Sequence, residues 1–415
     1  MQTLEPAFGV ELRAPAFNED RWVSPLNWAP ELRKQIDAPQ RVLIHDVTLR
    51  DGEQTARIAF TPEEKIFLAQ ELDKLGVHSI EPGLPVTPED RDVIRTLSKM
   101  GLKAKIVPLA RVMESDVDAT LEADADGMVL EFGLNPYLMK YVYKTGPDKL
   151  VDDIRRFAKI AKSAGKYVEF MGWDACRCED PSFLEDIFRG IGESPDIDRV
   201  TVADTFGMMH PLTTYAFIRN LRRWTGKPAG FHIHNDFGMA AANSLMAVSA
   251  GADMVHASIN GLGERAGNVA TEEIAMILQH LHDIDAGIDL SRLKPISDLV
   301  TEVSKARPAR NKPIVGDGLF EVESGIVVHI IESLRNTPLN GKLFPFKPET
   351  AGHPPYSVVL GRGTGLHSVR RLLRERGIET SEENVVALAE RIKKAGLIAK
   401  TALPDALVSS FLKDL

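Results

Sequence analysis

Eight short apolar runs alternate with longer helical patterns between residues 41 and 292, and this alternation constrains the fold of the chain most strongly. Strands that alternate with helices pair in parallel through right-handed crossovers. Eight such units in about 250 residues predict an α/β fold of the (β/α)8 TIM-barrel type. The alternative is an open doubly wound sheet, which would normally carry a phosphate-binding loop where this chain has TLRDGEQ. The candidate strands are Val42–Val47, Val77–Glu81, Lys105–Leu109, Met128–Phe132, Tyr167–Gly172, Val200–Asp204, Gly230–His234 and Met254–Asn260.

The rest of the chain does not follow this alternation. Residues 1–40 contain several prolines and two tryptophans without a clear period, which indicates an extension that packs over another element. For the first ten residues a mobile tail is an equal alternative. After the catalytic barrel, predicted at 41–292, we expect residues 293–415 to form a mainly helical lid and dimerisation region, with helices at about 319–336, at 364–377 and from Ser381 onward.

The composition excludes several function classes. The net charge of −9 does not suit a protein that binds a phosphate backbone, so no nucleic-acid partner is expected. Two cysteines, Cys176 and Cys178, are too few for a disulfide framework or a four-cysteine zinc site. The chain has neither a signal-peptide pattern at its start nor an apolar run of ~18 residues. We therefore expect a cytoplasmic protein without membrane association.

Three polar clusters follow predicted strands of the barrel. Arg50–Gln54 follow the first strand, His232 and His234 end the seventh, and Gly261–Asn268 follow the eighth. Residues i and i+2 of a strand point to the same side, so the two imidazoles form a candidate metal pair. Alone, such a pair more often represents two separately satisfied histidines. Loops one, seven and eight are neighbours on the catalytic face of a barrel, however, and their joint pattern is far more specific.

These loops predict a divalent-metal site. Asp51, His232, His234 and Asn268 can converge on one ion, and such a set suits zinc, manganese, iron or cobalt. Magnesium is a further candidate, although it prefers more oxygen ligands. The ion would hold a 2-oxo or 2-hydroxy acid and polarise its carbonyl group. Arg50 would stabilise the oxygen on which charge develops.

The motifs HDVTLRDGEQ, HIHND and GLGERAGN, in this order, resemble those of the metal-dependent Claisen-condensing barrels. That family includes 2-isopropylmalate, homocitrate and citramalate synthases, and its superfamily includes the hydroxymethylglutaryl-CoA lyases. The likeness covers residues 41 to about 290 and continues loosely through VGDGLFEVESGI and VVLGRGTG. GERAGN is similar to the synthase branch, because the lyases carry a cysteine-containing loop there.

The resemblance implies roles for individual residues. It implies that Asp51, His232, His234 and Asn268 hold the metal and that Arg50 is the electrophilic catalyst. It also implies acetyl-CoA as cosubstrate, a 2-oxo acid as acceptor, a place in amino-acid biosynthesis and a homodimer whose C-terminal helices reach the partner's site.

The same resemblance implies a substrate-binding set. Thr205 matches the threonine that holds the carboxylate of the 2-oxo acid. Glu264 matches a catalytic glutamate near the acyl-CoA. Arg177 and Gln54 match an arginine of the strand-five loop and the glutamine of the first motif.

The chain departs from the family pattern where acid–base residues are expected. Met171 and Trp173 occupy the serine and glutamate positions of the strand-five loop, and Leu138 stands where a histidine is expected. Val327 replaces the histidine of the C-terminal motif, and His329 lies ~200° away on a helix. The larger apolar residues indicate a less polar side-chain pocket, which disfavours a dicarboxylic 2-oxo acid.

Several groups are candidates for the missing base. Glu81, Glu131 and Glu169 end predicted strands, and His353 lies in a proline-rich loop. We take Glu81 as the catalytic candidate and place Glu131, with Trp173, among the substrate-binding residues. Alternation within a strand does not show which of the glutamates point inward.

The sequence supports three hypotheses for function. The first is an acyltransferase that condenses acetyl-CoA, or a related acyl-CoA, with a 2-oxo acid. The second is a lyase that cleaves a hydroxy acid or its CoA ester at the same metal. The third is a catalytically reduced barrel that binds metal without turnover.

Overall fold

The computed structural model describes residues 23–413, which form two compact units. The first unit runs from Ser24 to Pro308, and the second begins at Ala309. The first unit includes helix α11 (Leu293–Ser304), which follows the predicted domain boundary at residue 292. Among the described residues, no helix combines the length and apolar character needed to cross a membrane.

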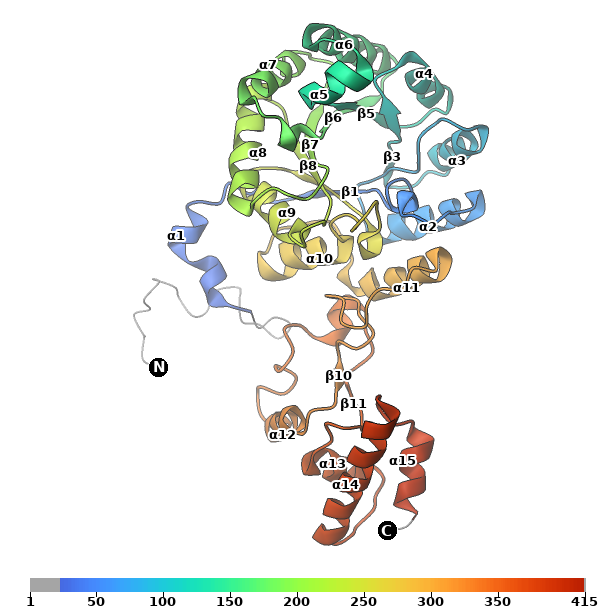
Figure 1. Ribbon diagram of the computed structural model, residues 1–415, viewed down its shortest axis with the longest axis vertical. Helices are drawn as coiled ribbons and strands as arrows, with labels where there is room; N and C mark the ends of the chain where they lie inside the picture. Colours follow the sequence, from blue (N-terminus) through green and yellow to red (C-terminus); the bar gives the residue numbers. More distant parts are fainter. Residues whose placement is uncertain (1–22, 414–415) are drawn as a thin grey trace. The chain divides into compact units, whose positions relative to one another are not determined.

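The first unit is built on a curled parallel sheet surrounded by helices (Figure 1). Hydrogen bonds join its strands in the order β3-β2-β1-β9-β8-β7-β6-β5-β4. This arrangement confirms the predicted TIM-barrel class. The strands are β1 (Leu43–Asp46), β2 (Ser79–Ile80), β3 (Lys105–Ile106), β4 (Leu109–Arg111), β5 (Gly127–Gly133), β6 (Tyr167–Trp173), β7 (Arg199–Asp204), β8 (Ala229–Ile233) and β9 (Met254–Ala257).

The predicted third strand is broken into two pieces. β3 pairs with β2, and β4 pairs with β5. Val107 and Pro108 lie between the pieces, and proline has no N–H to donate to a ladder. β3 and β4, which stand at the two ends of the hydrogen-bonded strand order, are therefore consecutive pieces of one stretch of chain.

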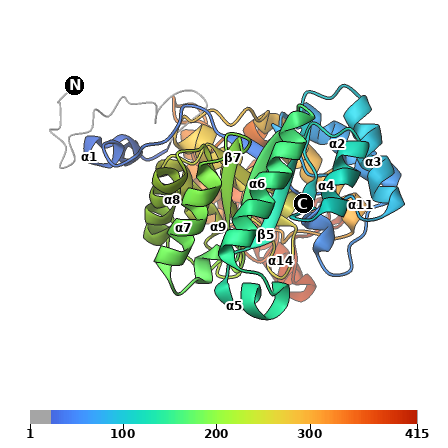
Figure 2. The same cartoon turned by 90° about the horizontal axis from the view of Figure 1, so that it is seen from above.

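The helices of this unit lie outside the sheet, and Figure 2 shows α6, α7 and α8 side by side there. Several begin with proline directly after a capping residue, as the sequence predicted: the side chains of Thr61, Thr87 and Asp180 each accept a hydrogen bond from a backbone N–H of the first turn. The helices are α1 (Pro30–Arg33), α2 (Pro62–Leu75), α3 (Pro88–Lys99), α4 (Glu114–Glu122), α5 (Pro136–Leu138), α6 (Pro147–Ser163), α7 (Pro181–Gly192), α8 (Pro211–Thr225), α9 (Ala240–Ser249), α10 (Thr271–Ala275) and α11.

The segment before the barrel is anchored to it by hydrogen bonds. The Asp37 amide donates to the Ser249 carbonyl at 2.8 Å, and Tyr215 donates its hydroxyl proton to the carbonyl of Gln35 at 2.5 Å. Residues 1–22 of the predicted N-terminal extension lie outside the described residues.

The second unit is mainly helical, as predicted. It contains a two-stranded parallel sheet of β10 (Glu321–Val322) and β11 (Ser357–Val358). The helix predicted at 319–336 therefore starts later than expected, because Glu321 and Val322 pair with another segment instead. Its helices are α12 (Gly325–Leu334), α13 (Leu366–Glu375), α14 (Glu382–Ala399) and α15 (Asp405–Leu412).

Candidate metal centre and active site

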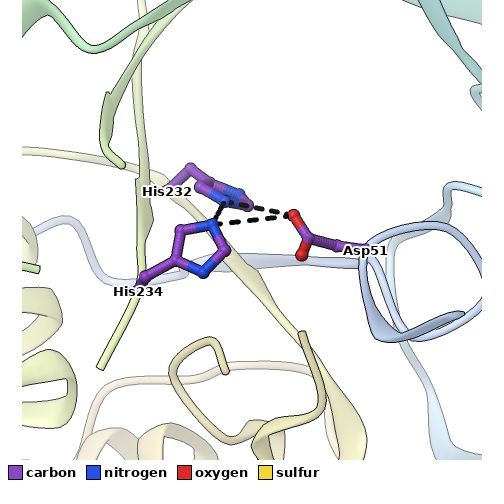
Figure 3. A group of neighbouring side chains, drawn as sticks. All are labelled: Asp51, His232 and His234. Atoms are coloured by element: carbon purple, nitrogen blue, oxygen red, sulfur yellow. Dashed lines mark hydrogen bonds and ion pairs between the residues drawn. The ribbon is translucent and has the colours of Figure 1, made fainter. Parts of the chain in front are cut away.

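Asp51, His232 and His234 bring three potential metal ligands together in the barrel (Figure 3). The Oδ2 atom of Asp51 lies 3.5 Å from Nε2 of His232 and 3.9 Å from Nε2 of His234. The two Nε2 atoms are 3.4 Å apart. Atoms with these separations can surround one ion at the roughly 2.1 Å typical of zinc bonds to nitrogen and oxygen. All three residues are buried, so the cluster is shielded from bulk water.

Local structure explains how the three side chains meet. His232 lies in β8 and His234 directly after it, so both project to the same side. Asp51 lies in a tight turn after β1, in which the amides of Asp51 and Gly52 donate to the Val47 carbonyl at 2.8 and 3.0 Å. The turn holds the Asp51 carboxylate opposite the two imidazoles.

The protonation states suit a cation. Burial lowers the pKa of His232 and of His234, so both imidazoles are neutral and offer a lone pair. Burial alone would raise the pKa of Asp51, but the Arg50 guanidinium, with His232 and His234, holds it below its ordinary value. Oδ1 of Asp51 and Oδ1 of Asn268 are buried without a hydrogen-bond partner. Such orphaned atoms are rare in folded proteins, and a bound ion would satisfy them.

Asn268 completes the cluster from the loop after β9. Its backbone forms an isolated antiparallel bridge with His234. Its Nδ2 donates to the carbonyl of Leu262 at 2.9 Å, which leaves Oδ1 as the free end of the amide. The side chain lies beside the Asp51 carboxylate.

A cavity of about 250 Å³ opens next to this cluster. Its wall combines charged residues with a cluster of apolar ones. Its lining residues are Arg50, Asp51, Gln54, Leu84, Leu109, Arg111, Glu131, Met171, Trp173, Ala203, Thr205, His232, His234 and Glu264.

The sequence of the barrel matches a known family over residues 41–300, that of the HMGL-like proteins. The chain belongs to the HMGL-like family. Over 368 residues it is 39% identical to a protein named homocitrate synthase AksA of Methanopyrus kandleri, across 88% of this chain and 90% of that protein. It is 37% identical over 368 residues to a 2-isopropylmalate synthase of Methanocaldococcus jannaschii, across 88% of this chain and 70% of that protein. These relatives confirm the resemblance read from the three motifs.

Solved structures agree at the level of the fold. The HMG-CoA lyase of Bacillus subtilis superposes with a TM-score of 0.60 at 20% identity, across 66% of this chain and 97% of that one. The HMG-CoA lyase of Pseudomonas aeruginosa superposes with a TM-score of 0.59 at 20% identity, across 65% of this chain and 95% of that one. At this identity the likeness concerns the barrel alone.

Most of the predicted substrate-binding residues of this HMGL-like chain line the cavity. Gln54, Thr205, Trp173 and Glu131 are all in its wall, together with Glu264, which was predicted to be catalytic. They come from five different loops or strand ends, which the barrel brings to one face.

Glu81 occupies a different place from the one that its predicted catalytic role requires. Its side chain is fully buried outside the cavity lining. One oxygen accepts from Nε of Arg50, and the other lies 3.2 Å from Nε2 of His45. The Nδ1 atom of His45 lies 2.7 Å from the hydroxyl of Ser79. Glu81 is therefore enclosed and acts on the site only through Arg50.

Arg177 is also held away from the cavity lining. Its guanidinium donates to both oxygens of the buried Asp174 at 2.6 and 2.7 Å. It lies over the ring of Phe206, with 3.8 Å between the guanidinium carbon and the ring centroid. The sequence predicted Arg177 as a site residue but did not predict its contacts with Asp174 and Phe206.

The other two candidate bases are engaged elsewhere. Glu169 is buried, with Oε1 lying 2.9 Å from Nε2 of His256. Nε2 of His353 lies 2.7 Å from the carbonyl oxygen of Ile314 and must donate to it. Neither residue lines the cavity.

Sequence reasoning missed Arg111, which ends β4 and lines the cavity. The predicted strand stopped at Leu109, so Arg111 was assigned to no site. Its Nε and Nη2 donate to the two oxygens of Asp116 at 2.7 and 3.0 Å. The cavity therefore has a second arginine whose charge is already balanced.

Substituting Gly263 by alanine is expected to weaken metal binding at least ~10-fold, the effect typical of disturbing groups that orient metal ligands. A Cβ atom there would lie 2.3 Å from Nδ2 of Asn268 and 3.0 Å from Oδ1 of Asp51, at a backbone φ of +155°. Metal affinity measured by titration checks this. The matched control is Gly146→Ala, where a Cβ meets nothing within 4 Å. Equal affinity in both variants would contradict the assigned position of Asn268.

Proposed function

We propose that this chain is a divalent-metal-dependent acyltransferase that condenses acetyl-CoA, or a related acyl-CoA, with a 2-oxo acid. The product is a hydroxy acid of the 2-alkylmalate type. The observation that carries this proposal is the Asp51, His232 and His234 cluster with Arg50 in the wall of the same cavity. Relatives named homocitrate, 2-isopropylmalate and citramalate synthase support it.

The proposed metal ligands are Asp51, His232, His234 and Asn268. The set fits an ion because both imidazoles are neutral and two side-chain oxygens are buried without partners. When bound, a divalent ion such as zinc, manganese, cobalt, iron or magnesium supplies Lewis-acid polarisation of a carbonyl group. A set of imidazole nitrogen and carboxylate or amide oxygen ligands is compatible with each of these ions.

Arg50 is positioned to stabilise negative charge. Its Nε donates to Glu81, and its Nη1 donates to Asp51 at 2.9 Å. Nη2 is buried without a partner. A fixed guanidinium with one free donor is suited to an oxygen that becomes negative during condensation, and such a donor acts without reorganisation. Glu81 is the positioning residue that fixes Arg50.

Thr205 and Gln54 offer polar groups to the acceptor. The Thr205 hydroxyl accepts from the amide of Asp174 at 2.9 Å, so its own proton is free to bind a carboxylate. Oε1 of Gln54 accepts from Nη1 of Arg50 at 3.3 Å, which directs its amide N–H groups elsewhere in the cavity wall. Both residues are proposed to hold the carboxylate of the 2-oxo acid.

The apolar side of the cavity favours an acceptor with an apolar side chain. Leu84, Leu109, Met171 and Trp173 pack against one another there. Arg111 does not counter this, because Asp116 already balances its charge. Burying apolar surface stabilises a bound ligand by about 25 cal/mol per Å². A distal carboxylate would find no unpaired cation in this wall.

Replacing Trp173 by alanine is expected to shift preference toward longer 2-oxo acids. The Trp173 ring fills the space against Gly133, where an added Cβ would lie 3.0 Å from it. Each methylene that a pocket gains is worth about 1–3 kcal/mol, so the ratio of kcat/KM for long over short acceptors should rise at least ~10-fold. Trp28→Ala, outside the cavity lining, is the control. An unchanged ratio would show that Trp173 does not bound the acceptor pocket.

The experiment that tests the proposed function is release of CoA thiol from acetyl-CoA with a panel of 2-oxo acids. The expected result is acceptor-dependent release that is greatest with an apolar side chain. If no acceptor releases CoA while hydroxy acids or their CoA esters are cleaved, the chain is a lyase. If neither reaction occurs and metal still binds, the chain is a binding barrel.

A further inference from the structure

Glu131 is the one carboxyl group of the cavity wall that no other described side chain engages. The wall contains three carboxyl groups, those of Asp51, Glu131 and Glu264. Asp51 accepts from Arg50, and Glu264 is 56% exposed and lies 3.5 Å from Arg265. Within residues 23–413, the Glu131 side chain forms neither a hydrogen bond nor an ion pair, although its backbone carbonyl accepts from the amide of Val112.

The strand register directs Glu131 into the cavity. On β5 it lies opposite Arg111 of β4 and Met171 of β6. Both neighbours also line the cavity, and paired residues of adjacent parallel strands project to the same side. The carboxyl group therefore stands among the apolar residues of the wall, on the same face as Arg50.

The surroundings of Glu131 bring its pKa close to neutral pH, where the carboxyl group is partly ionised. Burial raises the pKa of Glu131 to about 7; Arg50 opposes this, and the nearby carboxylates of Glu81, Asp51 and Glu264 reinforce it. Tyr143 also interacts electrostatically with Glu131, and Arg111 is its pairing partner on β4. A carboxyl group with a pKa near the working pH both accepts and returns a proton readily.

We propose that Glu131 is the general base that removes a proton from the carbon next to the thioester carbonyl of the acyl-CoA. This inference rests on the proposed function. The C–H electron pair becomes an enolate, whose carbon forms a bond to C2 of the 2-oxo acid. The C2=O π pair moves onto that oxygen beside Arg50, and the oxygen takes the proton from Glu131. Water then cleaves the C–S bond and yields a carboxylic acid and the CoA thiol.

A base at Glu131 explains how the chain can have Trp173 at a position where the family pattern has a glutamate. The resemblance implies a glutamate at that position on β6, where this chain has an apolar ring. Trp173 pairs with Gly133 on β5, and Glu131 stands two residues earlier on that strand. The carboxyl group is thus retained in the cavity but comes from the neighbouring strand.

The test uses Glu131→Gln in the full-length, metal-loaded protein. The measurement is deuterium uptake from D2O into the methyl group of acetyl-CoA, with a 2-hydroxy acid in the acceptor site so that no condensation follows. We expect uptake to fall ~10²–10⁴-fold in the variant, the usual contribution of a general base. Glu131→Asp should retain part of the rate. Metal content and acceptor affinity should equal those of the wild type.

Glu179→Gln is the matched control, because Glu179 lies on the loop after β6, bonded to Tyr137 and outside the cavity lining. Its uptake should equal that of the wild type. Uptake within threefold of wild type in Glu131→Gln overturns the proposal, and so does a change in acceptor preference or metal content without slower uptake. If the wild type condenses no acceptor and shows no uptake, the proposed function itself fails and this inference fails with it.

Discussion

Replacing His232 by alanine is expected to remove the bound divalent ion and to lower CoA release by more than ~100-fold. The variant loses one of two imidazole ligands whose Nε2 atoms lie 3.4 Å apart, and the remaining Asp51, His234 and Asn268 offer a single nitrogen ligand. Metal content by mass spectrometry and thiol release with a 2-oxo acid measure the two effects. His234→Ala should behave in the same way.

Two controls accompany this prediction. His329→Ala changes an exposed histidine of the second unit and should keep both metal and activity. Thermal unfolding of the metal-free wild type and of His232→Ala should coincide if the variant folds. Wild-type metal content in folded His232→Ala would refute the ligand assignment.

Replacing Arg50 by lysine is expected to lower kcat ~10²–10³-fold while leaving metal content unchanged. Lysine keeps the positive charge but lacks the planar guanidinium group. In Arg50 that group donates to both Glu81 and Asp51 and still has Nη2 without a partner. Steady-state kinetics with saturating acceptor measure the loss. Arg95→Lys, in an exposed pair with Asp92, should have no effect.

The two variants separate binding from chemistry. Loss of metal from Arg50→Lys would show that Arg50 acts by holding Asp51. An unchanged kcat would show that Arg50 does not stabilise the developing charge.

The fold was largely predictable because its strands are buried apolar runs of nearly the expected length. The long strands β5 and β6 match the predicted Met128–Phe132 and Tyr167–Gly172 to within one residue at each end. The two-residue strands β10 and β11 were missed, because so short a pairing leaves no periodic pattern. Pro108 stands inside the predicted third strand, but its presence alone did not predict that the strand is divided there into β3 and β4.

The candidate metal cluster was predictable because topology decides it. Asp51 follows β1, and His232 and His234 lie at the end of β8; the barrel separates these strands only by β9, so the approach of the three residues required no knowledge of side-chain packing. The choice between Glu81 and Glu131 did require it. Both end predicted strands, and the register together with the partner Arg50 decides which one is enclosed.

The positions of two arginines also could not be predicted. Arg177 has the right residue type, but the buried Asp174 beside it captures the guanidinium. Arg111 was overlooked because the predicted strand ended two residues too early. For Arg177 the missing information was a tertiary contact, and for Arg111 it was the end of a strand; neither is contained in the local sequence.

The most direct test of the central claim is a metal titration of the stripped full-length protein, with CoA release from acetyl-CoA and an apolar 2-oxo acid as the signal. The account predicts no turnover without metal, and full turnover once one divalent ion is bound for each copy of Asp51, His232 and His234. Equal turnover in the stripped and the loaded protein would contradict it.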